Sequence, residues 1–345
     1  MVDPARTGSR TEAPQRTCLV ITTISAPTAI LRELADGSEL AGWRTVIVGD
    51  VGSPPGFRLK GAQFLSMEAQ STMDFEVAEL LPTRHYCRKN LGYLWSIKEG
   101  ADVIVETDDD NRPLDRFWQP RQRLLAGRHS QDAGWVNAYC AFTTERVWPR
   151  GLPLDSVLGS TSALTASALL EGCPVQQGLV NGDPDVDAVY RLTLGENVEF
   201  RIEQPFVLRS GQWCPFNSQN TTWWPSAWPL LYLPATCTFR MTDIWRSLVA
   251  QAWLQGQGLH VAFTAPSMRQ ERNVHDLMRD FEDEIPGYLH NSAIVGALEG
   301  VPAGMPASDF LVCAYEKLVS LGLVDRTEIE IVRAWRRDVE RVMVR

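Results

Sequence analysis

Short apolar runs alternate with helical patterns through the first third of the chain. The runs 17–23 and 44–50 are rich in β-branched residues and end in polar or turn-forming residues, which is typical of buried strands. A helical pattern over 27–35 lies between them, and a stronger one over 83–100 precedes the apolar run 101–107. This alternation predicts an α/β fold with a mostly parallel central sheet and helices on both of its faces.

The pattern is less regular in the middle of the chain and becomes helical toward its end. The Ala, Ser and Leu residues of 160–172 predict a helix, and 175–180 a strand after it. The segment 213–229 is rich in Trp, Pro and Asn and is predicted to be a long loop. Helices are predicted over 242–255 and in the charged region from 273 to the end. Further strands are predicted at 61–66, 198–208, 230–233 and 259–263.

Length and composition are those of a globular protein with a large core. The chain has 345 residues, enough for one large α/β domain or for a domain with a helical appendage. Residues 1–16 are polar and lack an apolar segment, so we expect a disordered leader and not a signal peptide. The net charge of −9 argues against an extended nucleic-acid surface.

The distribution of apolar residues and of cysteines bears on the cellular location of the protein. The sequence has no stretch of eighteen apolar residues, so it predicts no transmembrane segment. Its seven cysteines are scattered and form no Cys-x-x-Cys motif. This is typical of reduced thiols and predicts a cytoplasmic protein with neither a disulfide framework nor a zinc site. The sequence leaves the oligomeric state open, with a homo-oligomer among the alternatives.

Three consecutive carboxylates follow a predicted strand. Asp108, Asp109 and Asp110 come directly after the run 101–107, and adjacent like charges favour protonation unless a cation neutralises them. Mg²⁺ typically takes one or two carboxylates and completes its shell with substrate phosphates. We therefore predict that Asp110 and Asp108 bind Mn²⁺ or Mg²⁺ beside a nucleoside diphosphate. The alternative is a solvated acidic turn.

Polar residues also follow the other predicted strands. Thr22 and Thr23 end the first strand, and Asp50 ends the second. Ligands of open α/β sheets bind at the carboxyl ends of the strands. We therefore expect these residues to converge with Asp108–Asp110 in one site, although they lie far apart in the sequence.

Three segments resemble two related groups, the reversibly glycosylated polypeptides, which are UDP-arabinopyranose mutases, and the STELLO-type glycosyltransferases. They are 86–95 (YCRKNLGYLW) with 107–111 (TDDDN), 178–181 (GLVN) through 185–188 (DVDA), and 231–234 (LYLP) through 237–246 (CTFRMTDIWR). The third segment is most similar to STELLO. The resemblance covers 17–285 and implies sugar chemistry on a nucleoside diphosphate donor. It also implies a GT-A-type, Rossmann-like nucleotide-sugar domain over 17–270. The helical pattern of the last part of the chain predicts a C-terminal helical extension over 271–345.

The chain departs from the family pattern in two places. Many GT-A proteins carry a His after the last core strand as a further metal ligand, whereas 264–267 (TAPS) follows the strand predicted at 259–263. Water or another residue such as His275 is the alternative ligand. The mutases also carry an arginine that becomes glycosylated, and Arg201 falls near that place in dissimilar surroundings.

The resemblance and the positions at strand ends together imply which residues bind the nucleotide-sugar donor. Thr22 and Thr23 would contact the base or ribose, Asp50 the N3–H of uracil, and Asp109 hydroxyls of the ribose or sugar. The alternatives are strand packing for the threonines and a turn-initiating role for Asp50.

The helix before the acidic strand adds three more candidates. Arg88 or Lys89 would pair with phosphate or sugar, and Arg suits bidentate phosphate contact. Asn90 would form a hydrogen bond with the nucleotide-sugar donor. The alternative for all three is an exposed polar helix surface.

An inverting transfer also needs a general base for the acceptor hydroxyl. Asp243 is the first candidate, with capping of its helix as the alternative, and Asp185 and Asp187 come next. A tryptophan cluster would stack on a sugar or lipid-linked acceptor, or else belong to the core or a subunit contact. Its members are Trp213, Trp223, Trp224 and Trp228.

These observations predict a metal-dependent glycosyltransferase that uses a nucleoside diphosphate sugar, with UDP as the expected nucleotide. One alternative is a UDP-sugar mutase of the reversibly glycosylated polypeptide type. The other is a non-catalytic assembly partner that keeps the GT-A fold.

Overall fold

A mixed β-sheet organises the protein. The computed structural model describes residues 15–159, 162–195, 197–270 and 276–344. Within these ranges it has an eleven-stranded sheet in the order β3-β2-β1-β4-β14-β11-β15-β12-β7-β9, with β5 paired to β15. The strands are β1 (Thr17–Thr22), β2 (Arg44–Val48), β3 (Ala62–Leu65), β4 (Val103–Thr107), β5 (Asn111–Pro113), β7 (Arg128–His129), β9 (Thr165–Ala166), β11 (Val175–Gly182), β12 (Phe206–Val207), β14 (Asn220–Trp223) and β15 (Val261–Gln270).

Two small sheets and a set of helices complete the fold. The small sheets pair β6 (Leu124–Leu125) with β10 (Glu171–Gly172) and β8 (Gly134–Trp135) with β13 (Gln212–Trp213). The helices are α1 (Ala29–Ala41), α2 (Met67–Ser71), α3 (Glu76–Leu80), α4 (Lys89–Lys98), α5 (Ala188–Thr193), α6 (Thr242–Gly256), α7 (Leu277–Glu299), α8 (Ala307–Ser320) and α9 (Glu328–Met343). The 3₁₀ turns are η1 (Tyr86–Arg88), η2 (Asp115–Trp118), η3 (Ala138–Ala141), η4 (Pro225–Leu231) and η5 (Phe239–Met241).

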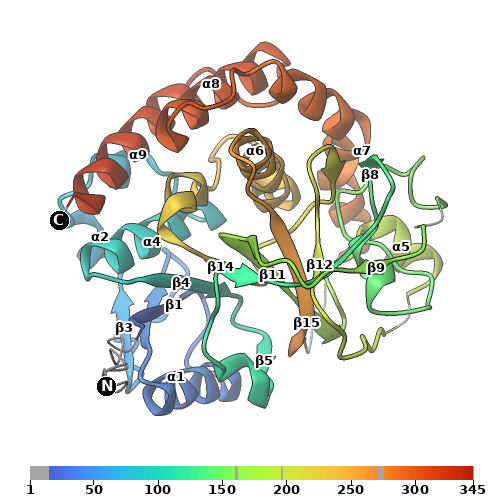
Figure 1. Ribbon diagram of the computed structural model, residues 1–345. Coiled ribbons are helices and arrows are strands. Elements are labelled where there is room, and N and C mark those ends of the chain that lie inside the picture. The colour runs from blue at the N-terminus through green and yellow to red at the C-terminus, as the bar shows by residue number, and fades with distance from the viewer. Residues whose placement is uncertain (1–14, 160–161, 196, 271–275, 345) are drawn as a thin grey trace, which may run out of the picture.

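The predicted α/β class is confirmed, with helices around a large central sheet (Figure 1). Strands β3, β2, β1 and β4 are parallel neighbours, as the alternation of the first third predicts. Farther along the sheet, β11 and β15 are also parallel, whereas β14 is antiparallel to both β4 and β11. The carboxyl ends of β1, β2 and β4 therefore meet at one edge, where the loops after them can form a common site.

The tryptophan-rich segment is not a loop, and this prediction was wrong. Residues 220–223 form β14 in the middle of the sheet, and the 3₁₀ turn η4 follows. All four tryptophans of the cluster are at most 5% exposed, so they are core residues and not a stacking platform for an acceptor. Trp223 donates its indole N–H to buried Glu106 at 2.8 Å. Because a central strand is buried on both faces, it lacks the alternating pattern that would have identified it.

Other local predictions were also wrong. The helix expected over 160–172 is absent from its described residues, which contain only the short strands β9 and β10, while 160–161 lie outside the described ranges. The strand expected at 230–233 overlaps the turn η4 instead, and 198–208 contributes only β12 and a single bridge at Val198. In each case tertiary packing overrides weak local propensity.

The C-terminal helices, predicted from the charged helical pattern, lie along one side of the molecule as an arc over α6 (Figure 1). They belong to the same hydrophobic cluster as the sheet. Glu328 at the start of α9 is fully buried and accepts hydrogen bonds from Ala235 N at 3.0 Å and Thr236 N at 2.9 Å. Trp335 donates to the carbonyl of Pro229 at 2.8 Å. The helices within residues 276–344 are therefore joined to the α/β part through buried polar contacts as well as apolar packing.

Within the described ranges, none of the helices combines the length and apolar character needed to cross a membrane.

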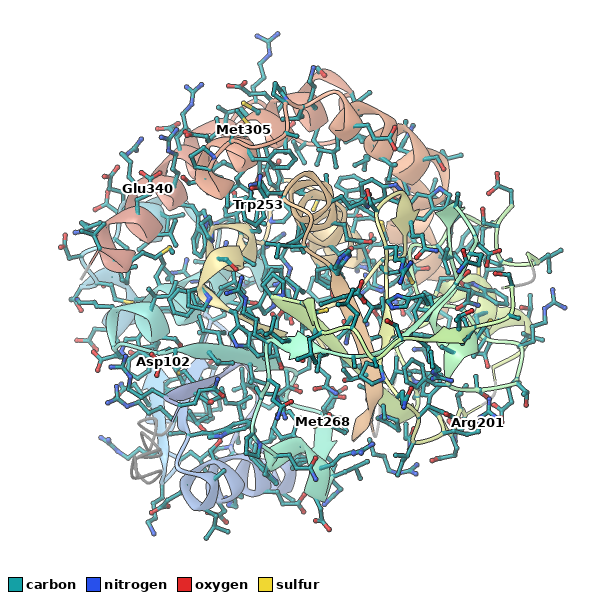
Figure 2. All side chains as sticks on the ribbon, in the orientation of Figure 1. Asp102, Arg201, Trp253, Met268, Met305 and Glu340 are labelled. Carbon is teal, nitrogen blue, oxygen red and sulfur yellow. The ribbon has the colours of Figure 1, made fainter. Side chains whose placement is uncertain are left out.

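The side chains fill the space between the helical arc and the sheet (Figure 2).

Candidate active site

A cleft of about 720 Å³ opens where β1, β2 and β4 end. It collects residues from the first strand, the loop before α4, the acidic turn after β4, and the region of η5 and α6. Of the residues predicted from the sequence, the cleft is lined by Thr22, Thr23, Asp50, Arg88, Asp108, Asp109, Asp110, Asp185 and Asp243. The expected convergence of distant strand ends is therefore present in the fold.

Each of the three consecutive carboxylates has its own neighbour. Asp108 accepts a hydrogen bond from the Tyr86 hydroxyl at 2.6 Å, and Asp109 accepts one from the Thr23 hydroxyl at 2.5 Å. Asp110 accepts one from the side-chain amide of Gln270 at 3.0 Å. Three adjacent residues thus point to three different parts of the cleft wall, which is not the behaviour of a freely solvated acidic turn.

Burial makes a negative charge at Asp108 costly. It raises the pKa of Asp108 to about 7, with Asp110 adding to the rise and the Lys89 ammonium opposing it. Burial also raises the pKa of Asp109, against the hydrogen bond from Thr23. A cation between Asp108 and Asp110 would relieve this electrostatic cost, so the two carboxylates fit the predicted role of metal ligands.

The described residues alone would not complete such a metal site. Among the described residues, no group of three His, Cys, Asp or Glu side chains is arranged to hold a metal ion. A cation held by two carboxylates would need oxygens from water or substrate for the rest of its shell, which is the usual situation of Mg²⁺ at phosphate sites.

Lys89 is a buried cation directly behind the carboxylates. Its side chain is fully buried, and its ammonium lies 3.0 Å from the carbonyl of Thr107, 3.4 Å from Asp108 and 3.8 Å from Glu106. The alternative of a solvated helix charge is therefore wrong for Lys89. Lys89 compensates part of the negative charge of Asp108 from within the core, but it does not line the cleft.

Arg88 lines the cleft but is also part of its framework. It is 4% exposed, and its guanidinium donates to Gln70 at 2.6 Å and to the carbonyl of Leu81 at 3.0 Å. Gln70 in turn donates to the carbonyl of Gly49 at the end of β2. Arg88 is thus not the solvated helix charge of the alternative interpretation, and part of its donor capacity is used to hold the strand-end loops in place.

Asp50 occupies the turn after β2. One of its oxygens accepts from the amide of Val51 at 2.6 Å, and the other accepts from the amide of His85 at 3.0 Å. The turn-forming role is therefore present, and the second contact also ties this turn to the loop before α4. Since Asp50 lines the cleft as well, the two interpretations of this residue are compatible.

On the opposite side of the cleft, Arg150 joins two of the candidate bases. Its guanidinium contacts both oxygens of Asp185, at 2.9 and 2.8 Å, and both oxygens of Asp243, at 3.0 and 3.1 Å. The backbone amide of Ser218 donates to Asp243 Oδ2 at 3.1 Å, and the Ser218 hydroxyl oxygen lies 3.1 Å from the same carboxylate oxygen. The Arg150 guanidinium, with Arg240 nearby, lowers the pKa of Asp185 although burial acts in the other direction. This side of the cleft is a charge-paired cluster held in a fixed geometry.

Like Lys89, the predicted residues Asp187 and Asn90 do not line the cleft. Asp187 caps α5 by accepting from Tyr190 N at 2.7 Å and also accepts from the Trp148 indole at 2.7 Å, while burial raises the pKa of its carboxyl to about 6. Asn90 is fully buried and exchanges two hydrogen bonds of 2.9 Å with the backbone of Leu233. Both side chains serve local structure, and Asn90 is not the exposed polar residue of the alternative interpretation.

The last core strand is longer than predicted. It runs to Gln270, because Met268, Arg269 and Gln270 pair with β11 beyond a register shift. Gln270, which contacts Asp110, ends this strand, and the residues directly after it, where the resemblance implied a histidine, lie outside the described residues. The alternative ligand His275 lies outside the described residues.

Several residues of the cleft had no role in the sequence-based prediction. Tyr86, Phe239 and Arg240 stand inside the recognised motifs, which was a signal that could have found them. Phe239 is 54% exposed, and its ring lies 5.8 Å from that of Tyr86. Arg150 and Ser218 lie in stretches without any local signal, and only the fold brings them to the cleft.

The fold and the cleft define an α/β protein with an acidic cleft at the carboxyl ends of its parallel strands. Residues 240–343 match the family model for STELLO glycosyltransferases. Over 272 residues the chain is 31% identical to "Probable glycosyltransferase STELLO2" of Arabidopsis thaliana, and over 269 residues it is 30% identical to "Probable glycosyltransferase STELLO1" of the same plant. These matches cover 73% and 72% of this chain and confirm that it is a relative of the STELLO glycosyltransferases.

The relatives are much longer than the matched region. The chain spans only 35% and 34% of the length of the two Arabidopsis proteins. Among solved structures, a chain described as "Crystal Structure of a Mycobacterial Protein" is 10% identical with a TM-score of 0.37, covering 85% of this chain and 76% of that one. A structural similarity that low defines neither fold nor function.

Proposed function

We propose that the protein is a metal-dependent glycosyltransferase with a nucleoside diphosphate sugar donor, and that the nucleotide is UDP. The supporting observation is the convergence of the strand-end residues, the Asp108–Asp110 carboxylates and the Arg150 cluster on one cleft. The names of the Arabidopsis relatives support the same class of reaction.

The donor would lie along the carboxyl ends of β1, β2 and β4. Thr22, Thr23 and Asp50 line the part of the cleft that would hold the nucleoside, and the rest of the donor would extend toward Asp108–Asp110. Asp108 and Asp110 would hold a divalent cation, which as a Lewis acid stabilises the charge that develops on the leaving diphosphate. Lys89 holds Asp108 from behind and limits its repulsion with Asp110.

The acceptor would lie against the other side of the cleft, near Phe239 and the charge-paired cluster. Asp243 is the proposed general base. Its Oδ2 accepts from Ser218 and Arg150, while its Oδ1 accepts from Arg150 and retains a second lone pair for an acceptor hydroxyl. Asp185 is bound by Arg150 through both oxygens and is the second candidate.

A thermal shift experiment tests the donor site. We expect UDP with Mn²⁺ to raise the melting temperature of the wild type, because a ligand at about a hundred times its Kd stabilises a protein by about 2.7 kcal/mol. The shift should be lost in Asp110→Ala and kept in Asp115→Ala, a matched control on the exposed surface of η2. An equal shift in the wild type and in Asp110→Ala would contradict the site assignment.

The mutase alternative depends on a glycosylated arginine. Arg201 does not line the cleft, and its side chain is 55% exposed. We therefore expect no covalent label on the protein after incubation with a radiolabelled UDP-sugar, and we expect Arg201→Ala to turn over donor like the wild type. A label that appears on the wild type and disappears in Arg201→Ala would favour the mutase instead.

A further inference from the structure

A short chain of hydrogen bonds crosses the floor of the cleft. The Tyr86 hydroxyl lies 2.6 Å from Asp108 Oδ1 and 2.7 Å from Ser218 Oγ. Ser218 Oγ lies 3.1 Å from Asp243 Oδ2. The chain Asp108–Tyr86–Ser218–Asp243 therefore connects the proposed metal ligand to the proposed base.

This chain has more contacts than protons to fill them. A carboxylate only accepts hydrogen bonds, and each hydroxyl has one proton to donate. Lys89, whose ammonium lies 2.7 Å from the Tyr86 oxygen, can only donate. When both carboxyl groups are ionised, two hydroxyl protons serve three oxygen–oxygen contacts, and one contact is left without a proton.

Without a cation, the arrangement that fills the two shortest contacts has a definite direction. Ser218 donates to Tyr86, and Tyr86 donates to Asp108. The contact of 3.1 Å between Ser218 Oγ and Asp243 is then the one without a proton, although Asp243 keeps the amide of Ser218 and the guanidinium of Arg150.

We propose that a cation on Asp108 reverses this chain, so that Tyr86 donates to Ser218 and Ser218 donates to Asp243. The inference rests on the proposed metal site. A cation at Asp108 Oδ1 competes with the Tyr86 proton for the same oxygen, and the nearest other acceptor for that proton is Ser218 Oγ. Once Ser218 accepts from Tyr86, its own proton is free for Asp243.

Tyr86 and Ser218 are then positioning residues that link the two halves of the cleft. Occupation of the donor side adds a hydrogen bond to Asp243 Oδ2 and fixes the carboxylate with Oδ1 toward the acceptor. Because these atoms are buried or half-buried, where hydrogen bonds are electrostatically stronger than in water, the reversal has an energetic consequence that can be measured.

The test measures the Mn²⁺ affinity of the 345-residue chain without nucleotide, by electron paramagnetic resonance of free Mn²⁺. Ser218→Ala is expected to weaken Mn²⁺ binding roughly tenfold, because Tyr86 then loses its bond to Asp108 without a replacement. In a Tyr86→Phe background the same Ser218→Ala substitution should leave the affinity unchanged. Ser218→Thr, which keeps the hydroxyl, should bind Mn²⁺ like the wild type.

Each outcome has a distinct meaning. A tenfold loss that appears only when Tyr86 is present supports the reversal. An equal loss in both backgrounds, or no loss in either, overturns it, since Ser218 would then act on the metal independently of Tyr86 or not at all. Failure of the wild type to bind Mn²⁺ would instead refute the metal site itself. Melting temperatures without Mn²⁺ verify that each variant is folded.

Discussion

Asp243→Asn is expected to lower turnover of the donor in the presence of acceptor by about 10²–10⁴-fold, which is the range for loss of a general base. Asparagine keeps the size of the side chain and one oxygen, so the contact with Ser218 can persist, but the amide cannot take the acceptor proton. The measurement is the rate of UDP release with Mn²⁺ at saturating donor. A KM for the donor close to that of the wild type would place the loss in the chemical step.

Two further variants make this result specific. Asp187→Asn is the matched control, because Asp187 caps α5 outside the cleft and asparagine caps helices about as well as aspartate. It should turn over donor like the wild type. Asp185→Asn separates the two acids that share Arg150. If Asp185→Asn abolishes turnover while Asp243→Asn retains it, the base is Asp185 and the assignment of Asp243 is wrong.

The acidic side of the site could be predicted from sequence because its signal is local. A strand pattern that ends in carboxylates or hydroxyls is visible within a few residues, as at Thr22, Asp50 and Asp108. The parallel arrangement of β1, β2 and β4, itself predicted from the alternation of strands and helices, then brings these ends together. Local pattern and topology suffice for this half of the cleft.

The other half could not be predicted in this way. Arg150 comes from a segment without regular structure, and Ser218 precedes a strand that the sequence pattern did not reveal. Their positions depend on β14, which enters the sheet antiparallel between β4 and β11. The structural roles of Asn90 and Asp187 were missed for a related reason. A polar residue in a motif can form hydrogen bonds with buried backbone groups as well as with a ligand.

Below the acidic turn, a buried ion pair joins the strand that carries the carboxylates to α6, which carries Asp243. Glu106 is fully buried and accepts two hydrogen bonds from Arg246, at 3.1 and 2.8 Å, and one from Trp223 at 2.8 Å. Tyr93 also donates to it. Burial alone would lower the pKa of Arg246, but the Glu106 carboxylate raises it above its ordinary value. The Arg246 guanidinium therefore stays charged, and its contacts with Glu106 fix the spacing between the two halves of the cleft.

Arg246→Met is accordingly expected to lower the free energy of unfolding by about 3–5 kcal/mol, because it leaves the Glu106 charge buried without its guanidinium partner. Urea denaturation at neutral pH measures this change through the transition midpoint. The double variant Glu106→Leu/Arg246→Met should be more stable than Arg246→Met alone, since it removes both charges of the pair, and Lys89, which lies 3.8 Å from Glu106, keeps Asp108 as its charge partner. A double variant that is less stable than the single one would show that Glu106 stabilises the fold through Tyr93 and Trp223 and that its pairing with Arg246 is secondary.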